Sequence, residues 1–152
     1  MKKPKKGKFR YQLDPVLKVR EIMEKKQKEA LAEKERLFNE EKKKEQELKD
    51  MQMQLNGTLR DALVGEIRDF GSILRQRSFL VKVKKDVSEQ EVKREKAEEE
   101  KEEQREKLVE KVKERQVIEK DKDNKKKMWK KVMDLEETKF LDDIATSQYS
   151  RK

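Results

Sequence analysis

The chain of 152 residues has no cysteine and no histidine, and only four glycines and two prolines. Without cysteine it can form neither a disulfide nor a thiolate metal site, which is typical of proteins in a reducing compartment. Without histidine it has no imidazole base, and no glycine-rich phosphate loop is present. The sequence therefore predicts a protein that is not an enzyme and that uses no metal and no cofactor.

Long apolar runs are also missing. No segment approaches the roughly 20 apolar residues that a membrane-spanning helix needs. The lysine-rich start is not followed by the apolar stretch of a signal peptide. These absences predict a cytoplasmic protein.

Charged side chains dominate what is present: they make up 51% of the residues, against 32% hydrophobic, and the mean hydropathy is −1.32. So few apolar residues cannot enclose a globular core. The polar residues are mostly lysine, glutamate and glutamine, which favour helix, whereas disordered chains are rich in proline, serine and glycine. The composition predicts an all-α protein whose long helices bury one narrow apolar stripe and which acts by contacting other proteins.

The charge is unevenly distributed. The net charge is +9, and residues 1–20 hold eight lysines and arginines against one aspartate, which gives +7 of that total. Such a basic tail can attach to acidic protein, nucleic acid or anionic lipid, or it can be a solvated segment without a dedicated partner. Both interpretations stay open at this point.

The first half of the chain predicts one long helix. Residues 1–13 are expected to form a basic flexible tail and an extended lead-in. Asp14 and Pro15 are a good helix start, because aspartate caps helices and proline is tolerated at the first helical position. Apolar residues at heptad spacing then predict a helix over about 15–55 that takes part in a coiled coil: Val16, Met23, Ala30, Leu37 and Met51.

The second half predicts a longer helix after a turn. Asn56 and Gly57 are the strongest turn signal, and further glycines extend the predicted turn region to 56–71, within which a short helix at 58–64 is an open alternative. A second apolar stripe predicts a helix over about 72–146, followed by a frayed end at 148–152.

Two helices with one break between them predict an antiparallel coiled-coil hairpin over 14–147, in which the second helix is the longer one. With the turn centred near residue 61, Leu37 should face about residue 86. The second helix beyond about residue 110 should then have no intrachain partner.

Two local patterns each have two interpretations. The apolar patch around Phe79 can pack near the turn or form a docking site, and its width beyond a single stripe favours docking. Lys125–Lys127 and Trp129 can form a nucleic-acid patch or a charged face beside a packed tryptophan. Because Trp129 shares a stripe with Val132 and Met133, the second interpretation is favoured.

The two ends of the chain carry a more specific pattern. Near the start it reads Phe9-x-Tyr11-x-Leu13-Asp14-Pro15-Val16-Leu17-x-Val19-Arg20-Glu21, and near the end Glu136-x-x-Lys139-x-Leu141-Asp142-Asp143-Ile144-Ala145. Over nearly its whole length the chain resembles the FliJ family of flagellar type III export proteins. The resemblance implies a two-helix antiparallel coiled coil similar to the central stalk of rotary ATPases.

The resemblance also implies a place in the cell. Members act as a stalk in the ring of the flagellar export ATPase, contact the cytoplasmic domain of the export-gate membrane protein, and interact with export chaperones. This chain is then expected in the cytoplasm, peripherally associated with the inner membrane at the flagellar base. A sister family in virulence injectisomes has the same shape, so the sequence leaves the choice between the two systems open.

The family pattern suggests contact residues. The gate contact of the family has the pattern F-x-x-x-L-x-x-A early in the second helix, and the matching positions here are Phe79, Val83 and Asp86, of which Asp86 departs from the small residue. The ATPase contact is expected on the uncovered apolar stripe and the start of the first helix: Val16, Leu17, Trp129, Val132, Met133, Phe140 and Ile144.

A different class of function is a basic coiled-coil adaptor that binds nucleic acid or acidic protein surfaces through its N-terminal tail. Nucleic acid is not expected as a partner of the helices, because the positive excess outside the tail is small. Salt dependence distinguishes the two functions, since nucleic-acid binding weakens steeply as salt rises.

Overall fold

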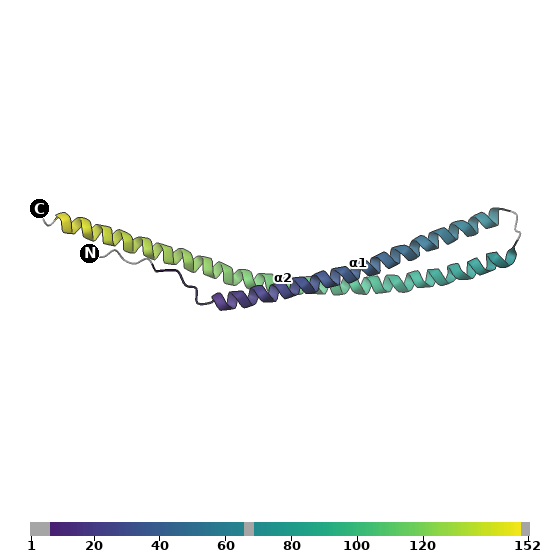
Figure 1. Cartoon of the computed structure of the whole chain (residues 1–152), viewed down its shortest axis with the longest axis horizontal. Helices are drawn as coiled ribbons and strands as arrows, with labels where there is room; N and C mark the ends of the chain where they lie inside the picture. The colour runs from purple at the N-terminus through teal and green to yellow at the C-terminus, as the bar shows by residue number, and fades with distance from the viewer. Residues whose placement is uncertain (1–6, 66–68, 150–152) are drawn as a thin grey trace. The chain divides into compact units, whose positions relative to one another are not determined.

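The computed structural model describes residues 7–65 and 69–149. They form two α-helices, α1 (Asp14–Val64) and α2 (Phe70–Tyr149), and no strand occurs in these ranges. The helices pack as an antiparallel hairpin in which α2 is the longer (Figure 1). The predicted all-α hairpin with a longer second helix is confirmed.

The predicted turn region 56–71 is too long. Helix α1 continues through Asn56 and Gly57 as far as Val64, and no glycine among the described residues has a positive φ. A glycine inside a helix costs only about 1 kcal/mol relative to alanine. Leu59, half a turn later, is buried in the hairpin, and this packing offsets the cost.

The helix ends differ correspondingly from those predicted. Helix α1 ends nine residues after the expected residue 55, and α2 begins at Phe70 and ends at Tyr149 rather than spanning about 72–146. Residues 1–6 of the expected tail and 150–152 of the expected frayed end lie outside the described residues.

The pairing of the two helices is shifted as a result. Gln90 bonds to Glu41, and Lys34 bonds to Glu100, so Leu37 lies opposite the segment between Gln90 and Glu100. The prediction that Leu37 faces about residue 86 is therefore wrong. The break comes later in the chain than residue 61, and in an antiparallel hairpin a later break moves every partner towards the C-terminus.

The chain divides into two compact units, each with a small core of its own. One is Lys26–Leu108, and the other combines Met1–Lys25 with Val109–Lys152. Near the helix connection, the core of the first unit consists of Leu59, Leu80, Val83 and Val87. In the second unit the buried apolar side chains are Tyr11 and Leu17.

Candidate interaction surfaces

The three predicted gate residues differ in accessibility. Val83 is only 2% exposed and belongs to the core against α1, whereas Phe79, one turn earlier, is 46% exposed. Asp86 is half-buried. The side chain of Val83 therefore supports the hairpin from inside, and Phe79 is the apolar member of the three that a partner can reach.

Further apolar side chains are exposed around Phe79 and near the helix connection. Leu74 and Val81 belong to the dense apolar patch of the sequence. The other exposed residues were missed because the expected turn region contained them: Leu63, Val64 and Phe70. Their common signal is a large apolar residue beside the break between the two helices.

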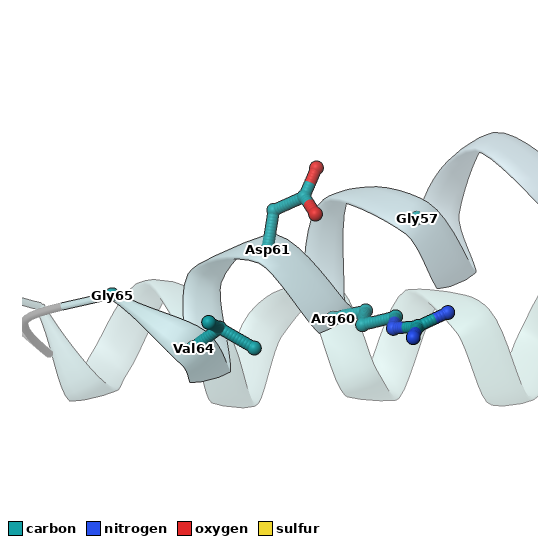
Figure 2. A pocket seen from close by; sticks show the side chains of 5 residues that line it. All are labelled: Gly57, Arg60, Asp61, Val64 and Gly65. Atoms are coloured by element: carbon teal, nitrogen blue, oxygen red, sulfur yellow. The ribbon is translucent and has the colours of Figure 1, made fainter.

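A shallow hollow lies at the C-terminal end of α1 (Figure 2). Its lining comes entirely from the last two turns of α1 and the residue after them: Gly57, Arg60, Asp61, Val64 and Gly65. Figure 2 shows the side chains of Arg60 and Asp61 pointing in different directions. Because its charged groups do not converge, this hollow has no constellation for holding a small ligand or for chemistry.

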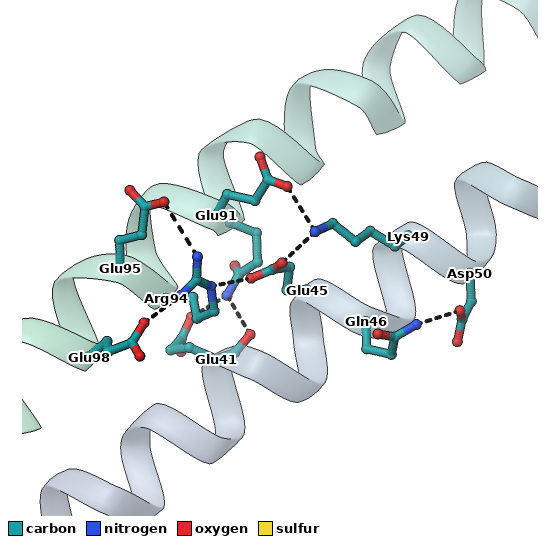
Figure 3. A network of polar contacts seen from close by, with 10 residues as sticks. Glu41, Glu45, Gln46, Lys49, Asp50, Glu91, Arg94, Glu95 and Glu98 are labelled. Carbon is teal, nitrogen blue, oxygen red and sulfur yellow. Dashed lines mark hydrogen bonds and ion pairs between the residues drawn. The ribbon is translucent and has the colours of Figure 1, made fainter.

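A polar network joins the two helices in the middle of the unit formed by residues 26–108 (Figure 3). The buried carboxylate of Glu45 accepts hydrogen bonds from Lys49 Nζ at 2.6 Å and from Arg94 Nε at 2.8 Å. Lys49 Nζ also lies 2.9 Å from Glu91 of α2. The hydrogen bond from Lys49, supported by that from Arg94, holds the pKa of Glu45 below its ordinary value.

Two glutamine side chains extend this polar pattern along the seam. The amide of Gln90 donates to both the carbonyl and the carboxylate of Glu41, and the amide of Gln104 donates to the side-chain oxygen of Gln27. Partly buried polar pairs of this kind favour one register over its neighbours, because a slipped hairpin would leave them without partners. The network is therefore structural, and it explains how so polar a seam pairs in a defined way.

The lead-in packs against α2 in the other unit. The ring of Phe9 lies 6.0 Å from that of Trp129, and Tyr11 is only 5% exposed. The hydroxyl of Tyr11 donates to Asp121 at 2.6 Å, and Lys122 Nζ donates to Asp14 at 2.6 Å. The prediction that α2 has no intrachain partner beyond about residue 110 is therefore wrong as far as Trp129.

The start of α1 strengthens the same packing. Arg20 pairs with Glu114, and Arg115 pairs with the buried Glu24. The sequence did not predict this coverage for two reasons. The shifted register brings α1 further along α2, and the lead-in, although not helical, covers one more stretch of it.

The contact between Tyr11 and Asp121 shifts the pKa values of both side chains. Burial, together with the hydrogen bond to the Asp121 carboxylate, raises the pKa of Tyr11 to about 12. The hydrogen bonds from Tyr11 and then Lys125 hold the pKa of Asp121 below its ordinary value. Over the physiological pH range the pair is therefore a neutral phenol bound to a carboxylate.

No helix among the described residues is long and apolar enough to cross a membrane. In residues 7–65 and 69–149, no group of three or more acidic side chains is placed to hold a metal ion.

The sequence pattern near the start of the chain thus lies in one unit with the later part of α2, which Phe9 contacts through Trp129. The family described as 'Flagellar FliJ protein' matches the chain over residues 9–152, and the matched region begins at Phe9. The chain belongs to the FliJ family. No curated protein and no solved structure matches it. As a FliJ family member it is a coiled-coil protein related to flagellar export, and the family is a structural component of export.

The residues predicted for the ATPase contact of this FliJ family member fall into three groups. Leu17 is buried, and Trp129 is half-buried against Phe9. Val16 and Val132 are exposed. The remaining ones are half-buried along α2: Met133, Phe140 and Ile144. The prediction omitted Leu135 and Leu141, which are also exposed on the last part of α2.

Proposed function

We propose that this FliJ family member is a stalk-like coiled-coil component of the flagellar type III export apparatus. It docks in the ring of the export ATPase, contacts the cytoplasmic domain of the export gate and interacts with export chaperones. In this role it is a cytoplasmic protein held at the inner membrane at the flagellar base. One observation carries the proposal: α2 continues from Lys130 to Tyr149, beyond the stretch that the lead-in covers, and presents apolar side chains there.

The ATPase contact is assigned to this last part of α2. Val132, Leu135 and Leu141 are exposed there, and Phe140 and Ile144 are half-buried. Burying a large apolar side chain contributes about 1.5–3 kcal/mol, so covering several of them in a ring can hold a stalk. Val16, exposed on the first turn of α1, belongs to the same unit and is assigned to the same contact.

Purified flagellar export ATPase provides the test. The triple variant Val132→Ala, Phe140→Ala and Ile144→Ala should lose stimulation of ATP hydrolysis. The matched control is Val109→Ala with Val117→Ala, which removes two exposed apolar side chains of α2 in the same unit, and this control should stimulate normally. Normal stimulation by the triple variant would exclude the last part of α2 as the contact.

The gate contact is assigned to Phe79, with Val83 as its support from within. Phe79→Ala should weaken binding to the cytoplasmic domain of the export gate while leaving the free energy of unfolding nearly unchanged. Val81→Ala, which removes a neighbouring exposed side chain, is the control and should bind normally. Val83→Ala should lower the free energy of unfolding by about 2 kcal/mol, because it empties a filled core position.

The same reagents distinguish the alternatives. A chain that stimulates an injectisome ATPase and not the flagellar one belongs to the sister system. An adaptor that acts through nucleic acid would instead bind oligonucleotides with an affinity that falls steeply as salt rises.

A further inference from the structure

Lysines crowd one stretch of α2. Residues 120–131 contain seven lysines and two aspartates. Lys122 is paired with Asp14 and Lys125 with Asp121, but five others are exposed and form no ion pair with the residues that the structure describes: Lys120, Lys126, Lys127, Lys130 and Lys131. Elsewhere on the helices, lysines are commonly neutralised by glutamates one turn away, as Lys44 is by Glu41. This stretch therefore keeps its positive charge.

The lead-in lies on the other side of this stretch of α2 and leaves the lysines uncovered. The contacts of Phe9 with Trp129 and of Tyr11 with Asp121 fix the lead-in against this stretch of α2. Lys8 and Arg10, on either side of Phe9, are exposed. Two basic segments from opposite ends of the sequence are thus combined in one unit, which the sequence alone did not indicate.

Apolar side chains lie among these lysines. Met128 is 68% exposed and Leu135 is 62% exposed. At about 100° per residue, Lys127, Lys131 and Leu135 follow one another on a single helix face, with Met128 beside them. Trp129, which packs on the lead-in, points to the other side of α2. The outward face of this part of α2 is therefore amphipathic, with cations and apolar groups side by side.

We propose that this surface, the face of α2 that carries Lys127, Lys130 and Lys131 with Met128 at its edge, binds anionic lipid headgroups at a membrane surface. Clustered lysines on a helix are attracted to an anionic bilayer, and neighbouring apolar side chains gain by entering the interface. Nucleic acid fits less well, because single-strand binding uses exposed aromatic rings for stacking and Trp129 is packed against Phe9.

This inference goes beyond the proposed function. Phe140, assigned to the ATPase contact, lies on the same side of α2 as Trp129, whereas Val132 and Leu135 of that contact border the lysine face, so the two proposed surfaces adjoin. The Asp123 and Asp134 carboxylates also lie on this part of α2, so the attraction comes from the net excess of lysines. Lipid contact would hold the protein at the membrane independently of any protein partner.

Trp129 is the only tryptophan, so its fluorescence reports on this unit directly. The full chain is mixed with vesicles of phosphatidylcholine containing phosphatidylglycerol, and with vesicles of phosphatidylcholine alone. Binding is measured by co-sedimentation and by the change in Trp129 emission. We expect binding to the anionic vesicles only.

A matched pair of variants tests the location. Lys127→Gln, Lys130→Gln and Lys131→Gln together should weaken binding to anionic vesicles by about fivefold for each lysine removed. The control removes the same charge from α1 by Lys42→Gln, Lys43→Gln and Lys44→Gln, and it should bind as the unaltered chain does. Circular dichroism verifies that both variants keep their helical content.

Three results would overturn the proposal. The first is an absence of binding to anionic vesicles. The second is an equal loss in the two triple variants, which would mean that only the net charge matters. The third is displacement of the protein from vesicles by an oligonucleotide at equal phosphate concentration, which would identify nucleic acid as the preferred partner. Stimulation of the ATPase in the absence of lipid is measured separately, so the two proposals can fail independently.

Discussion

The hydroxyl of Tyr11 donates a 2.6 Å hydrogen bond to the carboxylate of Asp121, across 110 positions of the sequence. Together with the contact between Phe9 and Trp129, it fixes the non-helical lead-in to the longer helix. The specific sequence pattern at the start of the chain therefore has a structural role, which is to cover part of α2.

This contact predicts an alkaline transition. The Tyr11 pKa is raised from 10.0 to about 12 by burial and by Asp121, so its contribution to stability is complete below pH 10.0 and is lost as the pH rises through about 12. Tyr149→Phe leaves Tyr11 as the only tyrosine, and ultraviolet absorbance then follows its deprotonation. We expect a midpoint near 12, and a lower one after Asp121→Asn. A midpoint at 10.0 in the Tyr149→Phe protein would contradict the burial of Tyr11.

Acid should destabilise the hairpin through its carboxylates. Hydrogen bonds from lysines hold the pKa values of Glu41, Glu45 and Glu100 below the ordinary 4.5. Their contribution is complete above that pH and is lost as the pH falls through the lowered values. Thermal unfolding followed by circular dichroism should therefore show a lower midpoint as the pH is taken below 4.5.

Two glutamate variants test whether Glu45 contributes to this loss of stability at low pH. Glu45→Gln should lower the unfolding midpoint at neutral pH and make it depend less on pH, because its bonds from Lys49 and Arg94 no longer involve a charged acceptor. Glu103→Gln, at an exposed position without an ion pair to any described residue, should change neither. Equal effects of the two substitutions would show that the polar network contributes nothing specific.

Gly57 provides a test of where the hairpin turns. It lies inside α1, its φ is not positive, and a Cβ added there meets no atom within 4 Å. Gly57→Ala should therefore stabilise the protein by about 0.5–1 kcal/mol, because alanine restricts the unfolded chain and favours helix. Urea denaturation measures the change. Destabilisation would instead support a turn at Asn56 and Gly57.

Gln76 is a local defect that a substitution can remove. Its Oε1 is buried and has no hydrogen-bond partner among the described residues. It lies one turn before the buried Leu80 and two before Val83, on the same face of α2. Gln76→Leu should raise the free energy of unfolding by about 1 kcal/mol, since an unsatisfied buried oxygen is replaced by an apolar group. At the exposed Gln54 the same substitution should stay within about 0.5 kcal/mol of zero.

The sequence by itself determined the helices and their hairpin arrangement. Helix propensity and the heptad stripe from Val16 to Met51 are local properties, so the sequence predicts them without knowledge of the rest of the fold. The helix start at Asp14 is local in the same way, because capping depends on the residues next to it.

Only the tertiary structure decided where the chain turns and what each apolar residue contacts. Gly57 stays helical because the packing of Leu59 in the hairpin outweighs a propensity cost of about 1 kcal/mol. The residue types next to Gly57 contain no information about that packing. The later turn shifts the register, which buries Val83, leaves Phe79 exposed and brings the lead-in onto Trp129. Contacts between residues so far apart depend on where the hairpin closes, and a change of a few residues there alters all of them.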